Sequence, residues 1–365
     1  MEEKGFWLAF QRIAGLGGTR MRNLCGRFGS LGEAWQAPLS SLRAVEGIGP
    51  ELAGRIEKAR REIDPQRLLT ELAKAGCEAI PYPDSRYPAS LKEIHDPPPV
   101  LYFKGQIEVL ALARAVAIVG TRSASPYGLR VARELAKRLA LEGITVISGM
   151  ALGIDAAAHL GALEVGGKTL AVLGCGPDVV FPRSNRGLYE RITKGNFVMS
   201  EYPPGTPPAA RHFPARNRIV SALAPAVVVV EAGERSGALI TADFALEQGK
   251  EVMAVPGPID QPGSLGTNRL IAQGARLVSS WEDVCSELGW SPRKKEGEIE
   301  IPLPDLSPEE AKVFSSLGAL PLNIDEIARN ARMEANVVTG ALVMLELKSL
   351  ATRLPGQRYQ RRVSQ

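Results

Sequence analysis

The sequence is poor in the residues that usually hold metal ions. Its 365 residues include only three histidines and four cysteines. No two cysteines form a Cys-x-x-Cys pair, and the histidines lack the spacing of metal ligands, so the sequence predicts no metal site. Thiols so far apart in the chain are expected to be buried and reduced, which is typical of the cytoplasm.

Signals for the membrane and for export are missing as well. No apolar run approaches the roughly 20 residues that a membrane-spanning helix requires. The segment 1–4, Met-Glu-Glu-Lys, does not begin the basic-then-apolar pattern of a signal peptide. We therefore expect a cytoplasmic protein that does not contact the membrane.

Two nucleotide-binding fingerprints are absent too. No Gly-x-Gly-x-x-Gly follows the first apolar strand, which argues against a bound dinucleotide. No Gly-x-x-x-x-Gly-Lys-[Ser/Thr] occurs, which argues against a P-loop triphosphatase. The sequence therefore predicts no cofactor. The net charge of +4 permits nucleic acid as a partner without requiring it. Whether basic residues cluster in the sequence is therefore the better indicator of such a partner.

The centre of the chain, about 115–280, alternates apolar strands with helices. Apolar strands separated by helices indicate a parallel sheet that is covered on both faces. A helix is expected over 127–141, where apolar residues recur with helical spacing. The sequence thus predicts a Rossmann-like, doubly wound α/β fold. Its predicted strands are Ala115–Val119, Ile144–Ile147, Thr169–Leu173, Asn196–Met199, Val227–Val230 and Glu251–Val255.

Residues 1–68 indicate a separate helical domain of the helix-hairpin-helix (SAM-like) type. Two similar glycine turns carry this prediction, Ile13–Arg20 and Val45–Leu52. Such turns can hold a phosphate on free backbone N–H groups, or they can serve only to pack helices. Both interpretations stay open, because Glu46 and Glu51 flank the second turn and would repel phosphate.

Proline and charge predict the remaining boundaries. The segments 79–88 and 97–105 are dense in proline and are expected to form an extended connecting passage within the α/β domain, 69–290. The segment 291–305 is charged and contains proline, which is typical of a linker. Residues 306–365 then predict a winged-helix domain. A helix start is expected at 306–310, two further helices at 323–331 and 334–348, and a hairpin at 350–353 and 357–360.

The segment Arg211–Arg218 concentrates three arginines, a histidine, an asparagine and an aromatic ring just before the strand near Ala226. A fold does not need such a cluster, whereas a flat, anionic partner such as nucleic acid does. Ligands of an open parallel sheet bind at the carboxyl ends of its strands, and a loop is expected there over 201–218. Guanidinium forks suit phosphate oxygens, and Phe213 can stack on a base. We call the carboxyl edge of the predicted sheet the rim. The arginines expected there are Arg122, Arg183, Arg186, Arg211, Arg216 and Arg218.

Three features of the rim leave alternatives open. Asp155 and His159 are four residues apart and resemble a catalytic pair, but a capping role for Asp155 and a hydrogen-bonded core position for His159 are favoured. The segment 236–241 opens a helix at a strand end, where it can receive an anion or simply cap the helix. One or two arginines are expected to pair with Glu201, Glu231 or Glu234.

A series of short motifs resembles the DNA-processing protein A family, also called DprA or Smf. The series runs in order over roughly 150 residues, and the two flanking domains extend the similarity to the whole chain. Arg183 stands where the family often has lysine, so the charge is kept. The motifs are Gly120–Arg122, Ser148–His159, Ala171–Asp178, Phe181–Asn185, Ser200–Pro203, Phe213–Ile219, Glu231–Ala242, Ala254–Gly257 and Gly266–Asn268.

The resemblance implies a bacterial recombination mediator that binds single-stranded DNA, usually as a homodimer, and that has no catalytic residue. Such proteins help to load the recombinase RecA onto strands covered by single-strand-binding protein, typically during natural transformation. The segment 268–278 resembles the one that the family uses for dimerisation. Carried over to this chain, the DNA-binding residues are Gly120, Thr121, Arg122, Gly149, Arg183, Asn185, Phe213, Arg216, Asn217 and Arg218.

Two other functions stay open beside this hypothesis. Nucleoside-monophosphate phosphoribohydrolases of the lysine-decarboxylase-like family share a similar core, but their Pro-Gly-Gly-x-Gly-Thr motif is replaced here by Glu231–Ser236. The winged-helix domain can also read duplex DNA, because four arginines lie on its hairpin and tail. Its candidate recognition helix, Glu334–Lys348, is largely apolar with two glutamates, so a protein contact or a packing role is an equal alternative.

Overall fold

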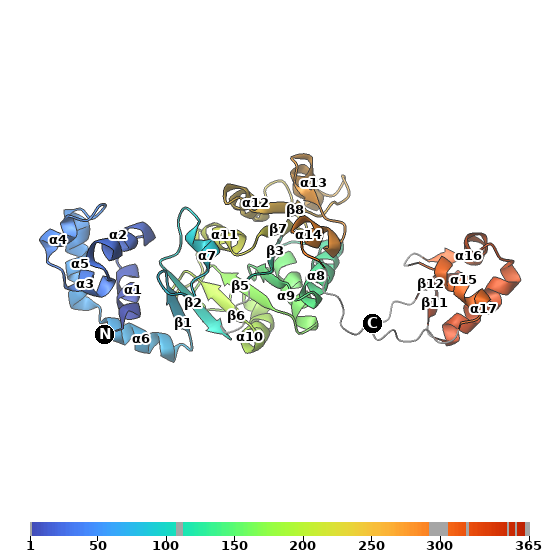
Figure 1. The fold of residues 1–365 in the computed structure, drawn as a ribbon, viewed down its shortest axis with the longest axis horizontal. Coiled ribbons are helices and arrows are strands. Elements are labelled where there is room, and N and C mark those ends of the chain that lie inside the picture. Colours follow the sequence, from blue (N-terminus) through green and yellow to red (C-terminus); the bar gives the residue numbers. More distant parts are fainter. Residues whose placement is uncertain are drawn as a thin grey trace. The chain divides into compact units, whose positions relative to one another are not determined.

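The structure is a computed structural model that describes residues 2–106, 112–291, 306–318, 321–348, 350–354 and 356–361. The chain forms two compact units, Met1–Pro292 and Arg293–Gln365 (Figure 1). The predicted linker, 291–305, lies outside the described residues apart from Ser291. No helix among the described residues is long and apolar enough to cross a membrane.

The larger unit is built on a nine-stranded sheet with the order β1-β2-β6-β5-β4-β3-β7-β8-β9. The strands from β6 to β9 in this order run parallel, while β2 lies antiparallel to β6 and β1 antiparallel to β2. The predicted Rossmann-like α/β fold is confirmed. The strands are β1 Glu78–Pro81, β2 Val100–Gly105, β3 Ala115–Val119, β4 Thr145–Ser148, β5 Thr169–Leu173, β6 Phe197–Ser200, β7 Ala226–Val229, β8 Glu251–Ala254 and β9 Arg276–Leu277.

The proline-rich passages contain more structure than the sequence analysis expected. They supply β1 and β2, which extend the sheet at one end, and the short helix α7, Ala89–Lys92, between them. Proline is tolerated in β1 because this strand lies at the edge of the sheet and Pro81 is its last residue. An extended connecting passage was therefore too weak a prediction for these residues.

Helices cover both faces of the sheet, as the wholly apolar strands require. On one face α8, α9 and α14 pack on Val116 and Ile118, and α10 packs over β5 and β6. On the other face α11, α12 and α13 pack on the alternate residues of the same strands, such as Ala117. The helices are α8 Pro126–Leu141, α9 Ile154–Glu164, α10 Arg186–Gly195, α11 His212–Ala222, α12 Gly237–Glu247, α13 Leu265–Ala272 and α14 Trp281–Glu287, with 3₁₀ turns at Arg183–Asn185 and Pro262–Ser264.

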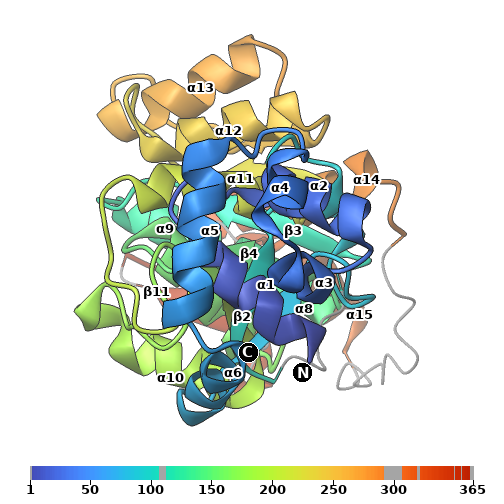
Figure 2. The same cartoon turned by 90° about the vertical axis from the view of Figure 1, so that its left-hand side faces the viewer.

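Six helices precede the sheet and form a second core around Trp7, Phe10 and Met21 (Figure 2). Tyr102 of β2 belongs to this core, and its hydroxyl donates to Oε1 of Gln11 at 2.5 Å. The two predicted glycine turns lie directly before α2 and α5 and leave the N-termini of both helices without a side-chain cap. The helices are α1 Glu3–Gln11, α2 Gly18–Phe28, α3 Leu31–Gln36, α4 Leu39–Arg43, α5 Pro50–Glu62 and α6 Pro65–Lys74.

The smaller unit has the three helices and the hairpin of the predicted winged helix. Its core contains Val313, Ile327, Leu342 and Tyr359. A capping box of Ser307 and Glu310 begins the first helix. The elements are α15 Pro308–Ser316, β10 Leu322–Asn323, α16 Ile324–Ala331, α17 Ala335–Leu347, β11 Ala351–Leu354 and β12 Arg358–Arg361.

The contact between α8 and α9 generates a first prediction. A Cβ atom added at Gly161 of α9 would lie 2.1 Å from the backbone oxygen of Arg133 in α8, whereas one added at Gly54 of α5 would meet open space. We expect Gly161→Ala to lower the free energy of unfolding by about 1–3 kcal/mol, because the helices must separate. The matched variant Gly54→Ala should raise it by about 0.5–1 kcal/mol. Urea unfolding tests both, and an equal effect of the two variants contradicts the close helix contact.

Candidate nucleic-acid interface

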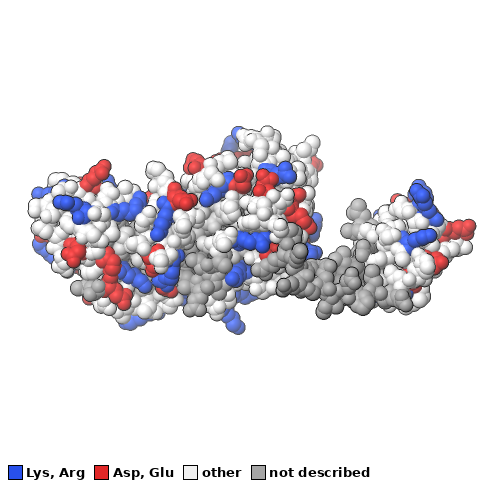
Figure 3. All heavy atoms as spheres, viewed as in Figure 1, with Lys and Arg blue, Asp and Glu red and all other residues white. Residues whose placement is uncertain are grey.

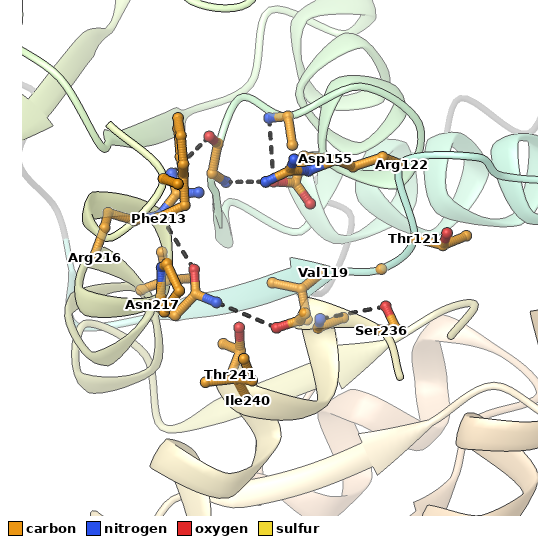
Figure 4. Close-up of a pocket in the computed structure, with 18 residues that line it drawn as sticks. Val119, Thr121, Arg122, Asp155, Phe213, Arg216, Asn217, Ser236, Ile240 and Thr241 are labelled. Carbon is orange, nitrogen blue, oxygen red and sulfur yellow. Dashed lines mark hydrogen bonds between the residues drawn. The ribbon is translucent and has the colours of Figure 1, made fainter. Parts of the chain in front are cut away.

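A pocket with a volume of about 510 Å³ opens at the carboxyl ends of the strands. It lies beside β3. The strands β4, β5 and β6 are added on one side of β3, and β7, β8 and β9 are added on the other, so the direction of strand addition reverses at β3. Ligands of open α/β sheets bind at such a topological switch point. The pocket is lined by the loop after β3, the turn after β4, Asp155 of α9, helix α11 and the start of α12 (Figure 4).

The loop after β3 is tied to the end of β7. The N–H of Thr121 donates to the backbone oxygen of Glu231 at 2.7 Å, and the Glu231 carboxylate accepts from the N–H and hydroxyl of Ser125 at 3.0 and 3.1 Å. A side chain at Gly120 would overlap Ile154. The loop is therefore fixed by backbone and buried contacts. The Glu231 carboxylate thus bonds to Ser125 and not to an arginine.

The arginine cluster lies on a helix, which corrects the loop that the sequence analysis expected over 201–218. Helix α11 begins at His212, inside the segment Arg211–Arg218. Pro214 is compatible with a helix in its first turn, where its missing N–H has no intrahelical partner. Ile219 and Val220 then anchor the helix in the core. Helical spacing consequently sends the three arginines of the cluster in different directions.

Arg216 points inward and is 5% exposed. Its Nη1 donates to the backbone oxygen of Gly149 at 2.6 Å and to that of Val172. Gly149 has to lack a side chain, because the guanidinium fills the space where its Cβ would lie. This one side chain thus joins α11 to the ends of β4 and β5.

Two further polar side chains shape the turn after β4. The Asp155 carboxylate accepts from the N–H groups of Gly149 and Ala151 at 3.1 and 3.3 Å. Asn185 donates its Nδ2 to the oxygen of Met150 at 2.9 Å. Met150 has a φ of 60°, a left-handed conformation that is unfavourable for a side chain of its size. Asp155 and Asn185 hold this strained turn from both sides.

Burial shifts the ionisation of the two charged groups beneath the pocket. Desolvation lowers the pKa of Arg216, and the negative charge of Asp155 opposes that shift. Desolvation likewise raises the pKa of Asp155, opposed by Arg216 and by the hydrogen bonds to the turn. Each group therefore depends on the other and on backbone partners to stay charged in the interior.

Cations and aromatic rings occupy the outer rim. The Arg122 guanidinium carbon lies 5.5 Å from the centre of the Phe213 ring, and the Phe181 ring lies 5.4 Å from that of Phe213. Among the described residues, none forms a hydrogen bond or an ion pair with the exposed side chains of Arg122, Arg183 and Arg211. Phe181 is 39% exposed and was not among the predicted contacts, although its place beside Arg183 in the motif could have marked it.

Basic and acidic side chains are interspersed over the face of the molecule that Figure 3 shows. The net charge of the chain is only +4. Attraction of an anionic polymer to the pocket therefore depends more on a few well-placed cations than on the net charge.

The remaining members of the cluster support α11. Arg218 has a side chain that is 13% exposed, and its Nη2 lies 2.7 Å from Oε2 of Glu201 and 3.6 Å from Oδ2 of Asp96. This is the expected pairing of one arginine within the fold. Asn217 donates its Nδ2 to the oxygen of Gly237 at 3.2 Å and so ties α11 to the start of α12.

Asp155 and His159 belong to separate networks. His159 is fully buried, and its Nδ1 lies 2.6 Å from Oγ1 of Thr169, which donates to the oxygen of Val146. The predicted core position of His159 is confirmed. Asp155 does not cap its own helix as expected, since α9 starts after Gly153 without a side-chain cap. It binds the preceding turn instead.

Comparisons with known proteins agree with this architecture. A family model described as DNA recombination-mediator protein A matches residues 78–289, and a DprA winged helix domain model matches 300–357. The protein Smf of Synechocystis sp. is 34% identical over 99% of both chains. The DNA processing protein DprA of Bacillus subtilis is 42% identical over 61% of this chain and 75% of its own.

The chain belongs to the DNA recombination-mediator protein A family. Solved structures of this family share the fold. The X-ray structure of DprA from Streptococcus pneumoniae aligns with a TM-score of 0.69 and 36% identity, over 79% of this chain and 99% of its own. A structure that describes the single-stranded DNA binding mode of DprA from Helicobacter pylori aligns with a TM-score of 0.53 and 30% identity, over 58% and 95%.

The buried arginine of this family member generates a stability prediction. We expect Arg216→Met to lower the free energy of unfolding by about 2–5 kcal/mol, because two buried carbonyl groups lose their donor at about 1–3 kcal/mol each. The exposed side chain of Arg211, directly before the same helix, offers a control, and Arg211→Met should change stability by less than about 0.5 kcal/mol. Urea unfolding measures both. Equal stability of the two variants would show that the guanidinium does not hold the site together.

The buried histidine generates a pH prediction. Burial and the Arg216 charge lower the pKa of His159 from 6.5 to about 3. The neutral ring therefore contributes stability that is complete above pH 6.5 and is lost as the pH falls, by about 1.4 kcal/mol per pH unit, because the unfolded chain takes up the proton first. We expect wild type to lose about 2 kcal/mol more than His159→Gln between pH 6.5 and 4.5 in urea titrations. Parallel losses in the two proteins would contradict the neutral, buried ring.

Proposed function

We propose that this protein is a non-enzymatic recombination mediator that binds single-stranded DNA at the rim of the pocket. The observation that carries the proposal is the unpaired Arg122 guanidinium beside the Phe213 and Phe181 rings at a switch-point pocket. A cation beside exposed rings is the combination that binds phosphates and unstacked bases together. Bases are free to stack on protein rings only in an unpaired strand, so the rim favours single strands over duplex.

The predicted residues divide into two groups in this proposal. Gly120, Thr121, Arg122, Arg183 and Phe213 lie where a strand can touch them. Gly120 would do so through its backbone and Thr121 through its hydroxyl, because the backbone groups of Thr121 are bonded to Glu231 and Ile154. Arg122 and Arg183 neutralise phosphates, and Phe213, together with Phe181, stacks on a base.

The other predicted residues position this surface without being its main contacts. Their polar groups are already bonded within the fold, so each would have to give up a partner before it could bind a phosphate. They are Gly149, Asn185, Arg216, Asn217 and Arg218.

Relatives support the assignment. Binding of single-stranded DNA is described for the H. pylori protein, whose fold this chain shares at 30% identity. Loading of RecA onto strands covered by single-strand-binding protein, in natural transformation, completes the proposed role in the cytoplasm. A homodimer through 268–278 is part of the proposal, and Leu277 and Leu265, which are 42% and 39% exposed, offer apolar area near it.

The two other functions receive less support. A phosphoribohydrolase needs an available acid or base in the pocket, yet Asp155 is buried and bonded to the turn. A duplex reader needs cations on its recognition helix, yet the sequence of α17, Ala335–Leu347, has neither lysine nor arginine, and Leu347 is 75% exposed.

The rim cation generates the test of this function. We expect Arg122→Ala to weaken binding of an oligothymidine several-fold and to lower the salt slope by about 0.7, because one phosphate contact is lost. The control is Arg138→Ala. Arg138 is an exposed arginine near the carboxyl end of α8, where it pairs with Glu134. Fluorescence anisotropy over a salt series measures both quantities.

The outcomes are distinct. Wild-type affinity and slope in the Arg138 variant, together with losses in the Arg122 variant, support the rim as the binding surface. Equal losses in both variants would show diffuse electrostatic attraction, and an unchanged Arg122 variant would place the strand elsewhere. Failure of the wild-type protein to bind single strands would overturn the proposed function itself.

A further inference from the structure

The loop that carries Arg122 is held on both sides of this arginine by one residue, Glu231. The backbone oxygen of Glu231 accepts from the N–H of Thr121, directly before Arg122, at 2.7 Å. The carboxylate of Glu231 accepts from the N–H and the hydroxyl of Ser125, on the other side of Arg122, at 3.0 and 3.1 Å. Glu231 itself lies just beyond the end of the central strand β7. The position of the loop is therefore set from the sheet through a single residue.

The Glu231 carboxylate is confined to one place in the interior. The residue is 8% exposed. A Cβ atom at Gly128, in the first turn of α8, would overlap Oε2, and one at Gly263, in the turn before α13, would overlap Oε1. Ser125, which binds the carboxylate, is also the N-cap of α8, and the amino end of a helix stabilises a negative charge. The carboxylate thus fits between two glycines and binds the residue where the loop joins α8.

Arg122 relies on this loop for its position. Its guanidinium carbon lies 5.5 Å from the centre of the Phe213 ring, and no described residue holds the side chain by a hydrogen bond or an ion pair. Figure 4 shows the side chain extending from the loop toward Asp155. An arginine without polar partners keeps much of its rotamer freedom, so the backbone from which it extends decides where its guanidinium can reach. A shift of the loop would move the cation away from the ring.

The charge of Glu231 has the wrong sign for attracting a nucleic acid. Considered only as a charge near the rim, the carboxylate repels phosphates, and its removal should tighten DNA binding. If the carboxylate instead positions the loop, loss of its acceptor oxygens should weaken DNA binding. The two explanations predict effects of opposite direction.

We propose that Glu231 is a positioning residue for single-stranded DNA binding, whose carboxylate holds Ser125 and so places the Arg122 guanidinium beside the Phe213 ring to meet a phosphate. The inference rests on the proposed function, because the phosphate belongs to the bound strand. Glu231 contributes to affinity without touching DNA. The property that binding requires is its acceptor oxygen rather than its charge.

Two substitutions separate the acceptor from the charge. Glu231→Gln removes the charge and keeps an oxygen that can accept from Ser125, whereas Glu231→Met removes both at a similar volume. Each is made with and without Arg122→Ala. Binding of an oligothymidine to the full-length protein is measured by fluorescence anisotropy over a salt series.

A further variant controls for lost stability. Leu139 is fully buried near the carboxyl end of α8, away from the loop, and Leu139→Ala leaves a cavity there. Thermal unfolding identifies a temperature at which every variant stays folded, and binding is compared at that temperature.

We expect Glu231→Met to weaken binding about fivefold and to lower the salt slope by about 0.7, because the Arg122 phosphate contact is lost. In the Arg122→Ala background the same substitution should change affinity by less than about twofold, since the cation that it positions is already absent. Glu231→Gln should stay within about twofold of wild type, because it keeps an acceptor. Leu139→Ala should keep the affinity and the salt slope of wild type.

Four results would overturn the positioning role. Unchanged or tighter binding by Glu231→Met shows that the acceptor is not needed. Equal losses in the methionine and glutamine variants assign the effect to charge, and an equal loss in Leu139→Ala assigns it to stability. Losses that multiply in the double variant separate Glu231 from Arg122. In each case a weakened Arg122→Ala still supports the proposed function, whereas a wild-type protein that does not bind single strands overturns both.

Discussion

The buried guanidinium of Arg216 is the interaction on which the site depends. It lies at the centre of the carboxyl edge, where it donates to the backbone oxygens of Gly149 and Val172 and so fixes α11 against β4 and β5. An arginine in an apolar interior is costly unless its donors are satisfied. Its position therefore requires a glycine at 149, and the negative charge of the nearby Asp155 favours the charged form of the guanidinium.

The motif residues consequently have two different roles. Residues such as Asn185 and Arg218 form hydrogen bonds and ion pairs within the fold and hold the base of the site in place. Arg122 lies on the loop after β3 and Phe213 lies on α11, and their side chains contact each other above this base. Binding surfaces that are fixed in advance lose less conformational entropy when a ligand arrives. A few unpaired groups on a stiff edge can thus attract a strand without a large basic patch.

The sequence predicted most of the sheet, because five-residue apolar runs such as Ala115–Val119 have few alternatives to a buried parallel strand. It did not predict β1 and β2, since the prolines beside them hide the strand pattern. It also placed Arg216 and Arg218 on a binding loop. Residue type identifies an arginine cluster, but only the helical geometry of α11 shows which guanidinium groups turn inward and which stay free.

The central claim is that a single strand lies along the edge made by the loop after β3, the start of α10 and α11. Hydrogen–deuterium exchange with and without an oligothymidine tests it most directly. The account predicts that slowed exchange is concentrated at Gly120–Arg122, at Phe181–Asn185 and in the first turns of α11 and α12, with the winged helix unchanged. Protection confined to the N-terminal glycine turns or to the winged helix, with the pocket edge unaffected, would contradict it.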